Sequence, residues 1–240
     1  MSWYNELRNQ VCPERPQLIE CKNSNSFGIL LVSNKSFFQQ VVNSYQQTAH
    51  LISNNFVERT TTRLLNDLIC QLKATGIVND VTSYNLDMAP HLHAQSLGHV
   101  SGMVEYLSPN DVGIDTRQRT IIRQKRLTEV RIDPESNLLS LTLHPLYGGW
   151  FGYRGLLVFH DIIWPQSLPR PEPLTFLTSE QRRSAILAYN LDPELGFWRD
   201  FNDPNSGKVV RYDAIQFAFF HERSIDRRRR ILELLSEENQ

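Results

Sequence analysis

Two short hydrophobic segments meet at the stretch His144-Pro145-Leu146-Tyr147-Gly148-Gly149-Trp150-Phe151-Gly152-Tyr153-Arg154-Gly155. Residues 138–143 predict a strand before this stretch, and residues 156–159 predict a strand after it. The Gly-Gly pair permits positive φ and a close approach of the backbone to a neighbour or a ligand. The aromatic rings and the forked cation of Arg154 suit a large flat ligand with anionic groups, or alternatively an aromatic-rich corner of a sheet with a surface arginine.

Length and composition limit the class of protein. The 240 residues are enough for one large domain, or for one domain with a cap, and a hydrophobic content of 40% supports a sizeable core. The net charge of −1 argues against a dedicated nucleic-acid binder. We expect no membrane span and no secretory signal, because no hydrophobic run is long enough and the first residues are polar. The widely spaced Cys12, Cys21 and Cys70 fit a reducing, cytoplasmic compartment.

The expected elements mix strands and helices without a regular βαβ rhythm, which predicts an α+β fold with an antiparallel sheet. We expect strands over 27–33, 77–84, 138–143 and 156–159, an exposed hairpin over about 117–132, and helices over about 36–49, 58–74, 91–107, 178–190, 209–221 and 224–236. The helix over 36–49 should have one hydrophobic face, formed by Phe37, Phe38, Val41, Val42 and Tyr45. Thr178 and Gln181 have the spacing of a capping box that opens the helix over 178–190. The helix over 91–107 is unusual because it would contain Gly98 and Gly102. Each glycine costs a helix about 1 kcal/mol relative to alanine, so a packing or ligand contact is expected there.

Familiar catalytic signatures are missing from the sequence. It has no G-x-S-x-G, G-x-G-x-x-G, Walker or H-E-x-x-H motif. The spacing of His91, His93 and His99 does not match a structural zinc site, so we expect no metal held by protein side chains. The arginines are more informative: Arg154, Arg199, Arg211 and the run Arg227–Arg230 all lie near aromatic residues. Several arginines at the entrance of one pocket can bind the carboxylates of a small peptide through paired hydrogen bonds. Each arginine considered singly is, alternatively, typical of an exposed surface charge.

Several motifs in a fixed order resemble the CblC (MMACHC) family of cytosolic cobalamin-processing proteins. They are Trp3-Tyr4-Asn5-Glu6-Leu7, Ala94-Gln95-Ser96, Gly98-His99-Val100-Ser101-Gly102, His144-Pro145, Gly148-Gly149-Trp150-Phe151, Arg154-Gly155, Trp198-Arg199-Asp200 and Arg211-Tyr212. The block from His144 to Gly155 is the most specific of these, and together they span nearly the whole chain.

The resemblance implies a fold like that of the flavin nitroreductases, with an antiparallel sheet, flanking helices and a C-terminal helical cap. It implies one cobalamin-processing domain over 1–240, with a core over 1–163 and a helical part over 174–240. Two reactions follow from it: reductive decyanation of cyanocobalamin with reduced FMN or FAD, and glutathione-dependent dealkylation of alkylcobalamins bound base-off. The implied partner, besides these small molecules, is a downstream cobalamin-trafficking protein.

The resemblance also implies a set of site residues. The cobalamin contacts that it implies are Leu92, His93, Ala94, Gln95, Tyr106, Leu107, Ser108, Thr142 and Tyr153. The glutathione contacts that it implies are Arg154, Arg199, Arg211, Arg227 and Arg230, with Arg154 matched most clearly and the position within Arg227–Arg230 left open. The nucleophile would be the thiolate of bound glutathione, so no catalytic side chain is required.

Two other functions remain open at the level of sequence. One is a nitroreductase-like flavin oxidoreductase that acts on a different substrate. The other is a non-catalytic cobalamin carrier, which would bind the same ligand without removing its upper axial group.

Overall fold

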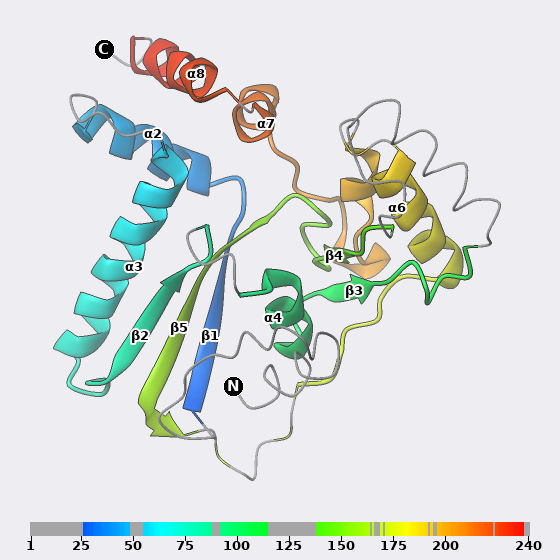
Figure 1. Cartoon of the computed structure of the whole chain (residues 1–240), viewed down its shortest axis with the longest axis horizontal. Helices are drawn as coiled ribbons and strands as arrows, with labels where there is room; N and C mark the ends of the chain where they lie inside the picture. The colour runs from blue at the N-terminus through cyan, green and yellow to red at the C-terminus, as the bar shows by residue number, and fades with distance from the viewer. Residues whose placement is uncertain are drawn as a thin grey trace. The chain divides into compact units, whose positions relative to one another are not determined.

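The computed structural model describes residues 26–48, 55–87, 92–114, 138–163, 165, 169, 171–191, 193, 196–222 and 224–237 (Figure 1). The chain divides into two compact units, each built from separate segments. The first unit comprises Met1–Leu97, Gly152–Arg170 and Tyr212–Gln240, and the second comprises Gly98–Phe151 and Pro171–Arg211.

A three-stranded antiparallel sheet organises the first unit, with the order β1-β5-β2 (Figure 1). The strands are β1 (Ser26–Ser33), β2 (Val81–Asn85) and the long central β5 (Gly152–Ile163). β5 carries five consecutive buried residues, Gly155 to Phe159, because both of its edges are paired and its faces are covered. The strands predicted over 27–33 and 156–159 are thus confirmed, and β5 is longer at both ends than its hydrophobic run indicated.

In the described part of the first unit, the sheet is accompanied by the helices α2 (Phe37–Thr48), α3 (Phe56–Ala74), α7 (Ala214–His221) and α8 (Ile225–Glu237). The face predicted for α2 is buried as expected, and it packs against Phe219 of α7 and Leu232 of α8 in one hydrophobic cluster. The ring of Phe38 lies 5.2 Å from that of Phe219. α2 and α8 therefore share one core, although they are far apart in the sequence.

The second unit contains a two-stranded antiparallel sheet of β3 (Glu105–Leu107) and β4 (Leu141–Leu143), the helix α6 (Ser179–Leu191), and two 3-10 turns, η1 (Phe197–Asp200) and η2 (Pro204–Ser206). The predicted capping box opens α6: the backbone N–H of Gln181 donates to Thr178 Oγ1, and the backbone N–H of Thr178 donates to Gln181 Oε1. Leu141, Leu143, Ala185 and Ile186 form the centre of its core.

The helix predicted over 91–107 is wrong in its second half. The helix α4 covers only Ala94–Val100, and β3 begins at Glu105. Gly102 has a φ of +67°, which ends the helical path, and its backbone N–H donates to the carbonyl of His99. A Cβ at Gly102 would lie 3.0 Å from Pro171 Cβ, so this glycine also allows a close approach within the second unit. The unusual glycine thus marks a turn rather than an irregular helix.

The remaining predictions have mixed outcomes. An antiparallel sheet with flanking helices is confirmed, while the likeness to flavin nitroreductases stays a prediction, as does the single domain over 1–240 with parts 1–163 and 174–240. The helix predicted from residue 209 begins only at Ala214, because Asp213 and Gln216 form a capping box there. The hairpin predicted over 117–132 lies outside the described residues.

A buried carboxylate, that of Glu105, holds the second unit together. Its side chain is 2% exposed, and its Oε2 accepts hydrogen bonds from the backbone N–H groups of Phe176 (2.8 Å) and Leu177 (3.0 Å). Its Oε1 lies 2.6 Å from Arg182 Nε on α6. One side chain thereby joins β3 to the segment that leads into α6, and it satisfies two backbone donors that would otherwise be buried without partners.

We expect Glu105→Ala to lower the free energy of unfolding by about 3 kcal/mol, because it breaks a buried ion pair and leaves two backbone donors without an acceptor. Urea denaturation followed by circular dichroism measures this change. The exposed Glu172 in the same unit provides a control, since Glu172→Ala should change stability by less than about 0.5 kcal/mol. Equal midpoints for Glu105→Ala and the unsubstituted protein would contradict the role of Glu105.

A histidine side chain shapes the turn that follows β4. His144 Nδ1 accepts hydrogen bonds from the backbone N–H groups of Leu146 (3.1 Å) and Tyr147 (3.4 Å). The backbones of His144 and Gly148 also exchange two hydrogen bonds of 2.8 Å across the turn. Burial lowers the pKa of His144. The neutral ring, with its lone pair on Nδ1, is therefore the form that supports the turn.

This histidine should make stability depend on pH. A lowered pKa in the folded state means that the unfolded chain binds the proton more readily. The stabilisation is therefore complete above the unfolded pKa of about 6.5 and declines as the pH falls through the folded pKa. His144→Asn should reduce this decline, because an asparagine side chain accepts the same backbone hydrogen bonds without titrating.

Urea denaturation of both proteins at neutral pH and at about pH 5 tests the difference. The exposed His221 offers a control, and His221→Asn should leave the decline unchanged. A decline as steep in His144→Asn as in the unsubstituted protein would show that His144 is not responsible.

Candidate functional site

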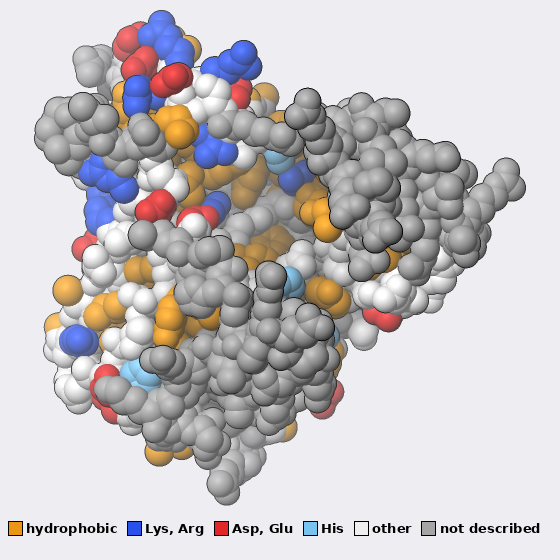
Figure 2. All heavy atoms as spheres, viewed as in Figure 1, with side chains coloured by type: hydrophobic (Ala, Val, Ile, Leu, Met, Phe, Trp, Pro, Cys, Tyr) orange, Lys and Arg blue, Asp and Glu red, His pale blue; other side chains and the backbone are white. Residues whose placement is uncertain are grey.

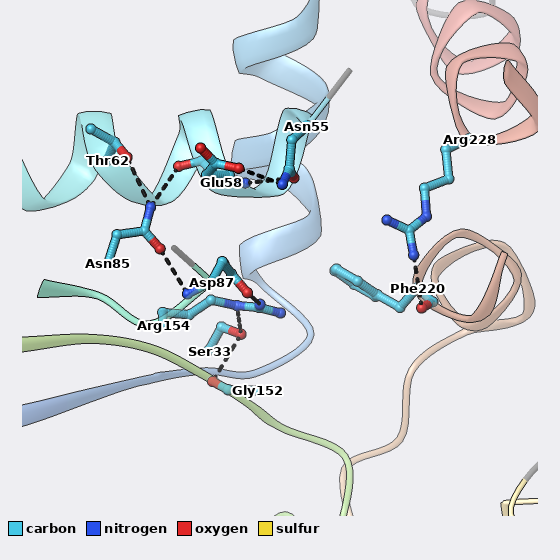
Figure 3. A network of polar contacts seen from close by, with 10 residues as sticks. All are labelled: Ser33, Asn55, Glu58, Thr62, Asn85, Asp87, Gly152, Arg154, Phe220 and Arg228. Atoms are coloured by element: carbon cyan, nitrogen blue, oxygen red, sulfur yellow. Dashed lines mark hydrogen bonds and ion pairs between the residues drawn. The ribbon is translucent and has the colours of Figure 1, made fainter. Parts of the chain in front are cut away.

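Arg154, on β5 in the first unit, occupies the most distinctive polar environment among the described residues (Figure 3). Its side chain is only 15% exposed. Its Nε donates to Ser33 Oγ at 2.8 Å, and its guanidinium carbon lies 4.7 Å from the ring centroid of Phe37 and 5.7 Å from that of Phe220. The Arg154 cation is thus hydrogen-bonded to a hydroxyl group and lies over two aromatic rings.

The hydroxyl of Ser33 orients this arginine. While it accepts from Arg154 Nε, it also lies 3.4 Å from the carbonyl of Gly152, to which it donates (Figure 3). A Cβ at Gly152 would lie 2.6 Å from Arg154 Nη2, so a larger residue at position 152 would shift the guanidinium from its present place. The edge strand β1 and the first residue of β5 therefore fix the direction of the cation.

Among the described residues, the acidic group paired with Arg154 is Asp87, which follows β2. Its Oδ1 lies 3.5 Å from Arg154 Nη1, longer than the roughly 2.7–2.9 Å of a strong charge-assisted hydrogen bond. Burial lowers the pKa of Arg154, an effect that Asp87 opposes. Burial likewise raises the pKa of Asp87, and the charge of Arg154 opposes that shift. Within the described residues, no carboxylate binds this guanidinium through both of its branches.

The run Arg227–Arg230 on α8 presents its side chains in different directions. Figure 2 shows basic and acidic side chains intermixed over α8. Arg227 and Arg230, the two that were predicted as contacts, are 79% and 64% exposed and have acidic partners in Glu222 and Glu233. These two assignments stay predictions.

Arg228 is the member of the run that lies against the aromatic residues of α7. Its Nη2 donates to the carbonyl of Phe220 at 3.5 Å, and its guanidinium carbon lies 5.8 Å from the ring centroid of Phe219 (Figure 3). Phe220 also lies beneath Arg154, so one aromatic residue connects the two cations. Sequence alone could not select this register within four successive arginines.

The predicted Arg199 and Arg211 belong to the second unit. Arg211 forms a fork with Asp200, at 2.7 Å from Nε to Oδ1 and 2.8 Å from Nη2 to Oδ2. Trp150 Nε1 donates to the same Oδ1 at 2.9 Å. Arg199 lies over the rings of Trp198 (4.2 Å) and Trp150 (5.7 Å). Both arginines therefore take part in a structural cluster around Asp200.

The Gly-Gly pair packs against this cluster. A Cβ at Gly148 would overlap the carbonyl oxygen of Arg199, and a Cβ at Gly149 would overlap the ring of Trp198. The backbone N–H of Gly149 donates to the carbonyl of Arg199 at 2.9 Å. The close backbone approach that these glycines permit is therefore made to a neighbouring part of the chain. The Gly148-Gly149 and Trp198-Arg199-Asp200 motifs, which are separate in the sequence, pack against each other.

Five of the predicted cobalamin contacts lie in the first unit. They are Leu92, His93, Ala94 and Gln95, at the start of α4, and Tyr153 on β5. His93 Nδ1 accepts from the backbone N–H of Ser96 at 3.2 Å and lies 2.8 Å from its hydroxyl, which caps the helix. Leu92 is 6% exposed.

The other four predicted cobalamin contacts lie in the second unit. Tyr106 on β3 is paired with Thr142 on β4, and Leu107 is paired with Leu141. Leu107 is 2% exposed and belongs to the core of the second unit. Ser108 Oγ accepts from the backbone N–H of Asn110 at 3.2 Å and forms a turn after β3. The structure therefore brings Tyr106 and Thr142 together directly, and all nine assignments stay predictions.

Sequence reasoning missed Ser33, Phe37, Asp87 and Phe220 as neighbours of Arg154. Ser33 and Arg154 are separated by 121 positions, and no local pattern connects them. Only Phe37 carried a signal, as a member of the hydrophobic face predicted for its helix.

The described residues contain neither a metal-binding cluster nor a membrane-spanning helix. In that part of the chain, no group of three or more His, Cys, Asp or Glu side chains is arranged to hold a metal ion. None of the described helices has the length and hydrophobicity needed to cross a membrane.

Comparison with known proteins gives consistent matches. An MMACHC-like protein of Caenorhabditis elegans is 30% identical over 135 residues, which are 55% of this chain and 44% of that protein. The cyanocobalamin reductase / alkylcobalamin dealkylase of Gallus gallus is 29% identical over 134 residues, 55% of this chain and 47% of that protein. The matched regions thus span less than half the length of these two relatives.

A solved structure supports the fold. The crystal structure of the Caenorhabditis elegans B12-trafficking protein CblC superimposes with a TM-score of 0.71 at 22% identity, and the match covers 96% of this chain and 85% of that one. The sequence model of the "Methylmalonic aciduria and homocystinuria type C family" (MMACHC) matches residues 1–232. The chain therefore belongs to the MMACHC family of cobalamin-processing proteins.

Proposed function

We propose that this protein is an enzyme that removes the upper axial ligand of cobalamin, by glutathione-dependent dealkylation of alkylcobalamins and by reductive decyanation of cyanocobalamin. The observation that carries the proposal is the environment of Arg154. A partly desolvated guanidinium, oriented by Ser33 and paired only loosely with Asp87, is suited to bind a carboxylate of the tripeptide glutathione. The names of the relatives supply the reactions.

We propose that Arg228, rather than Arg227 or Arg230, binds the second carboxylate of glutathione. Glutathione has two carboxylates, and Arg228 shares the aromatic neighbour Phe220 with Arg154. Arg227 and Arg230 are mostly exposed and each has an acidic partner. Cations near the bound peptide would also raise the thiolate fraction of its cysteine, because positive charge lowers a thiol pKa.

The proposed dealkylation needs no nucleophile from the protein. The thiolate sulfur of glutathione attacks the alkyl carbon bound to cobalt. A carbon–sulfur bond forms, and the cobalt–carbon bond breaks with both of its electrons remaining on cobalt. The products are a thioether and cob(I)alamin. The role of the protein is to bind both substrates and to orient the sulfur, which lowers the entropic cost of the encounter.

The proposed decyanation uses reduced FMN or FAD as an electron donor. One electron reduces cobalt(III) to cobalt(II), and cyanide leaves with the electron pair of its bond to cobalt. We assign no described residue to the flavin. The proposed location is the cytoplasm, where glutathione is reduced and abundant, and the proposed recipient of the product is a downstream cobalamin-trafficking protein.

An anaerobic absorbance titration of methylcobalamin with the purified protein, followed by addition of glutathione, tests the proposal. We expect a shift to the base-off spectrum on binding, and then conversion to cob(I)alamin. A base-off shift without conversion would indicate a carrier, and the absence of any shift would remove cobalamin as the ligand. A flavin bound tightly by purified protein that does not respond to cobalamin would favour an oxidoreductase with another substrate.

Arg154→Gln should lower the dealkylation rate at subsaturating glutathione by roughly 10- to 100-fold, the loss of one hydrogen-bonded charge. The base-off shift should remain. Arg59→Gln, a matched change on α3 in the same unit, should leave both unchanged. Arg154→Lys, which keeps the charge but loses the fork, should give an intermediate rate. An unaltered dependence on glutathione in Arg154→Gln would show that Arg154 does not bind it.

A further inference from the structure

Asp87 is held next to Arg154 by contacts that do not involve its own carboxylate. The backbone N–H of Leu86 donates to the carbonyl of Arg154 at 3.0 Å. The backbone N–H of Asp87 donates to Asn85 Oδ1 at 3.0 Å, and Asn85 Nδ2 in turn donates to the carbonyl of Glu58 and to Thr62 Oγ1 on α3 (Figure 3). The position of Asp87 is therefore fixed by the sheet and by α3.

The guanidinium is fixed independently of Asp87. Its Nε is bound by Ser33, and its plane lies against Phe37 and Phe220. Two separately anchored groups of opposite charge thus face each other at 3.5 Å without closing to a short hydrogen bond. A largely buried cation is costly without a counter-ion, and this arrangement supplies one while leaving the contact weak enough to be exchanged.

We infer that Asp87 is a specificity-determining residue: an internal counter-ion that neutralises Arg154 in the ligand-free protein and competes with the incoming carboxylate for the same guanidinium. This inference rests on the proposed function, since it takes glutathione as the ligand of Arg154. A carboxylate that binds both branches of the guanidinium can replace Asp87, whereas a weakly bound single-point anion cannot overcome its repulsion.

A competing counter-ion and a purely structural residue at position 87 predict opposite changes in glutathione affinity when Asp87 is substituted. If Asp87 only positioned Arg154, its substitution would weaken glutathione binding. As a competing counter-ion, Asp87 should weaken binding when present, so Asp87→Asn should bind glutathione more tightly. The amide has the same shape and still accepts a hydrogen bond from Arg154, and only the negative charge is lost.

The experiment is isothermal titration of the full-length protein with glutathione and, separately, with inorganic phosphate. For Asp87→Asn we expect glutathione to bind about tenfold more tightly, which is the order of change produced by removing one negative charge close to a bound anion. The affinity for phosphate should rise by a larger factor. In dealkylation assays, the KM for glutathione should fall while kcat stays unchanged. Asp67→Asn, which removes the same charge from an exposed position on α3, should change neither value.

Thermal unfolding provides a second measurement on the same variants. Without ligand, Asp87→Asn should unfold at a lower temperature than the unsubstituted protein, because its buried cation lacks a counter-ion. Glutathione should raise the unfolding temperature of this variant by more than it raises that of the unsubstituted protein, since it supplies the missing charge.

Different results would overturn the glutathione site and the role of Asp87. Glutathione binding that is insensitive to Arg154→Gln would remove the proposed site. Glutathione binding that depends on Arg154 but is unchanged or weakened in Asp87→Asn would overturn the inference about Asp87 and leave the proposed function intact.

Discussion

The central strand β5 is the constraint on which the first unit depends. Its backbone pairs with β1 on one edge and with β2 on the other, so the other two strands of the sheet are positioned with respect to it. The residues from Gly155 to Phe159 have no freedom to move without breaking two ladders. Arg154 directly precedes this buried run, at an irregularity in the ladder with β1, where Leu31 pairs with Gly155 and Val32 with Tyr153. On the other side, its carbonyl accepts a hydrogen bond from the backbone N–H of Leu86. The end of the buried run thus carries the most chemically distinctive side chain among the described residues.

A guanidinium at this place is not stabilised by the sheet itself. Ser33 reaches it from β1, Asp87 from the end of β2, and Phe37 and Phe220 from two helices. Each contact is modest, and the side chain is nevertheless held on several sides. A site assembled from rigid elements in this way can bind an anion without first reorganising, which lowers the entropic cost of binding.

Local sequence patterns predicted the elements that depend on local chemistry. The buried face of α2 followed from its hydrophobic period, and the start of α6 followed from the Thr178 and Gln181 capping pair. The helix over 91–107 failed because Gly102 was treated as a tolerated interior glycine, whereas its positive φ ends the helix. The sequence offers no local rule that separates these two uses of glycine.

The site was predictable only in part, because its contacts are long-range. Arg154 was identified by its motif, but its neighbours come from four elements that are scattered along the chain. The run Arg227–Arg230 gave a cluster of charge without a register, and only the packing of α8 on the core distinguishes Arg228 from the others. The Gly148-Gly149 and Trp198-Arg199-Asp200 motifs were recognised separately, and no pattern indicated that they touch.

The shared core of α2, α7 and α8 affects how the chain is made. The ring of Phe38 is synthesised well before its partner Phe219. Until then the part of the hydrophobic face of α2 that packs on α7 and α8 has no cover, and such exposed surfaces are where nascent chains aggregate or engage chaperones. A chain that stops before α7 would lack both this cover and Phe220, so shortening the protein from its carboxyl end would remove part of the anion site and part of the core in one step.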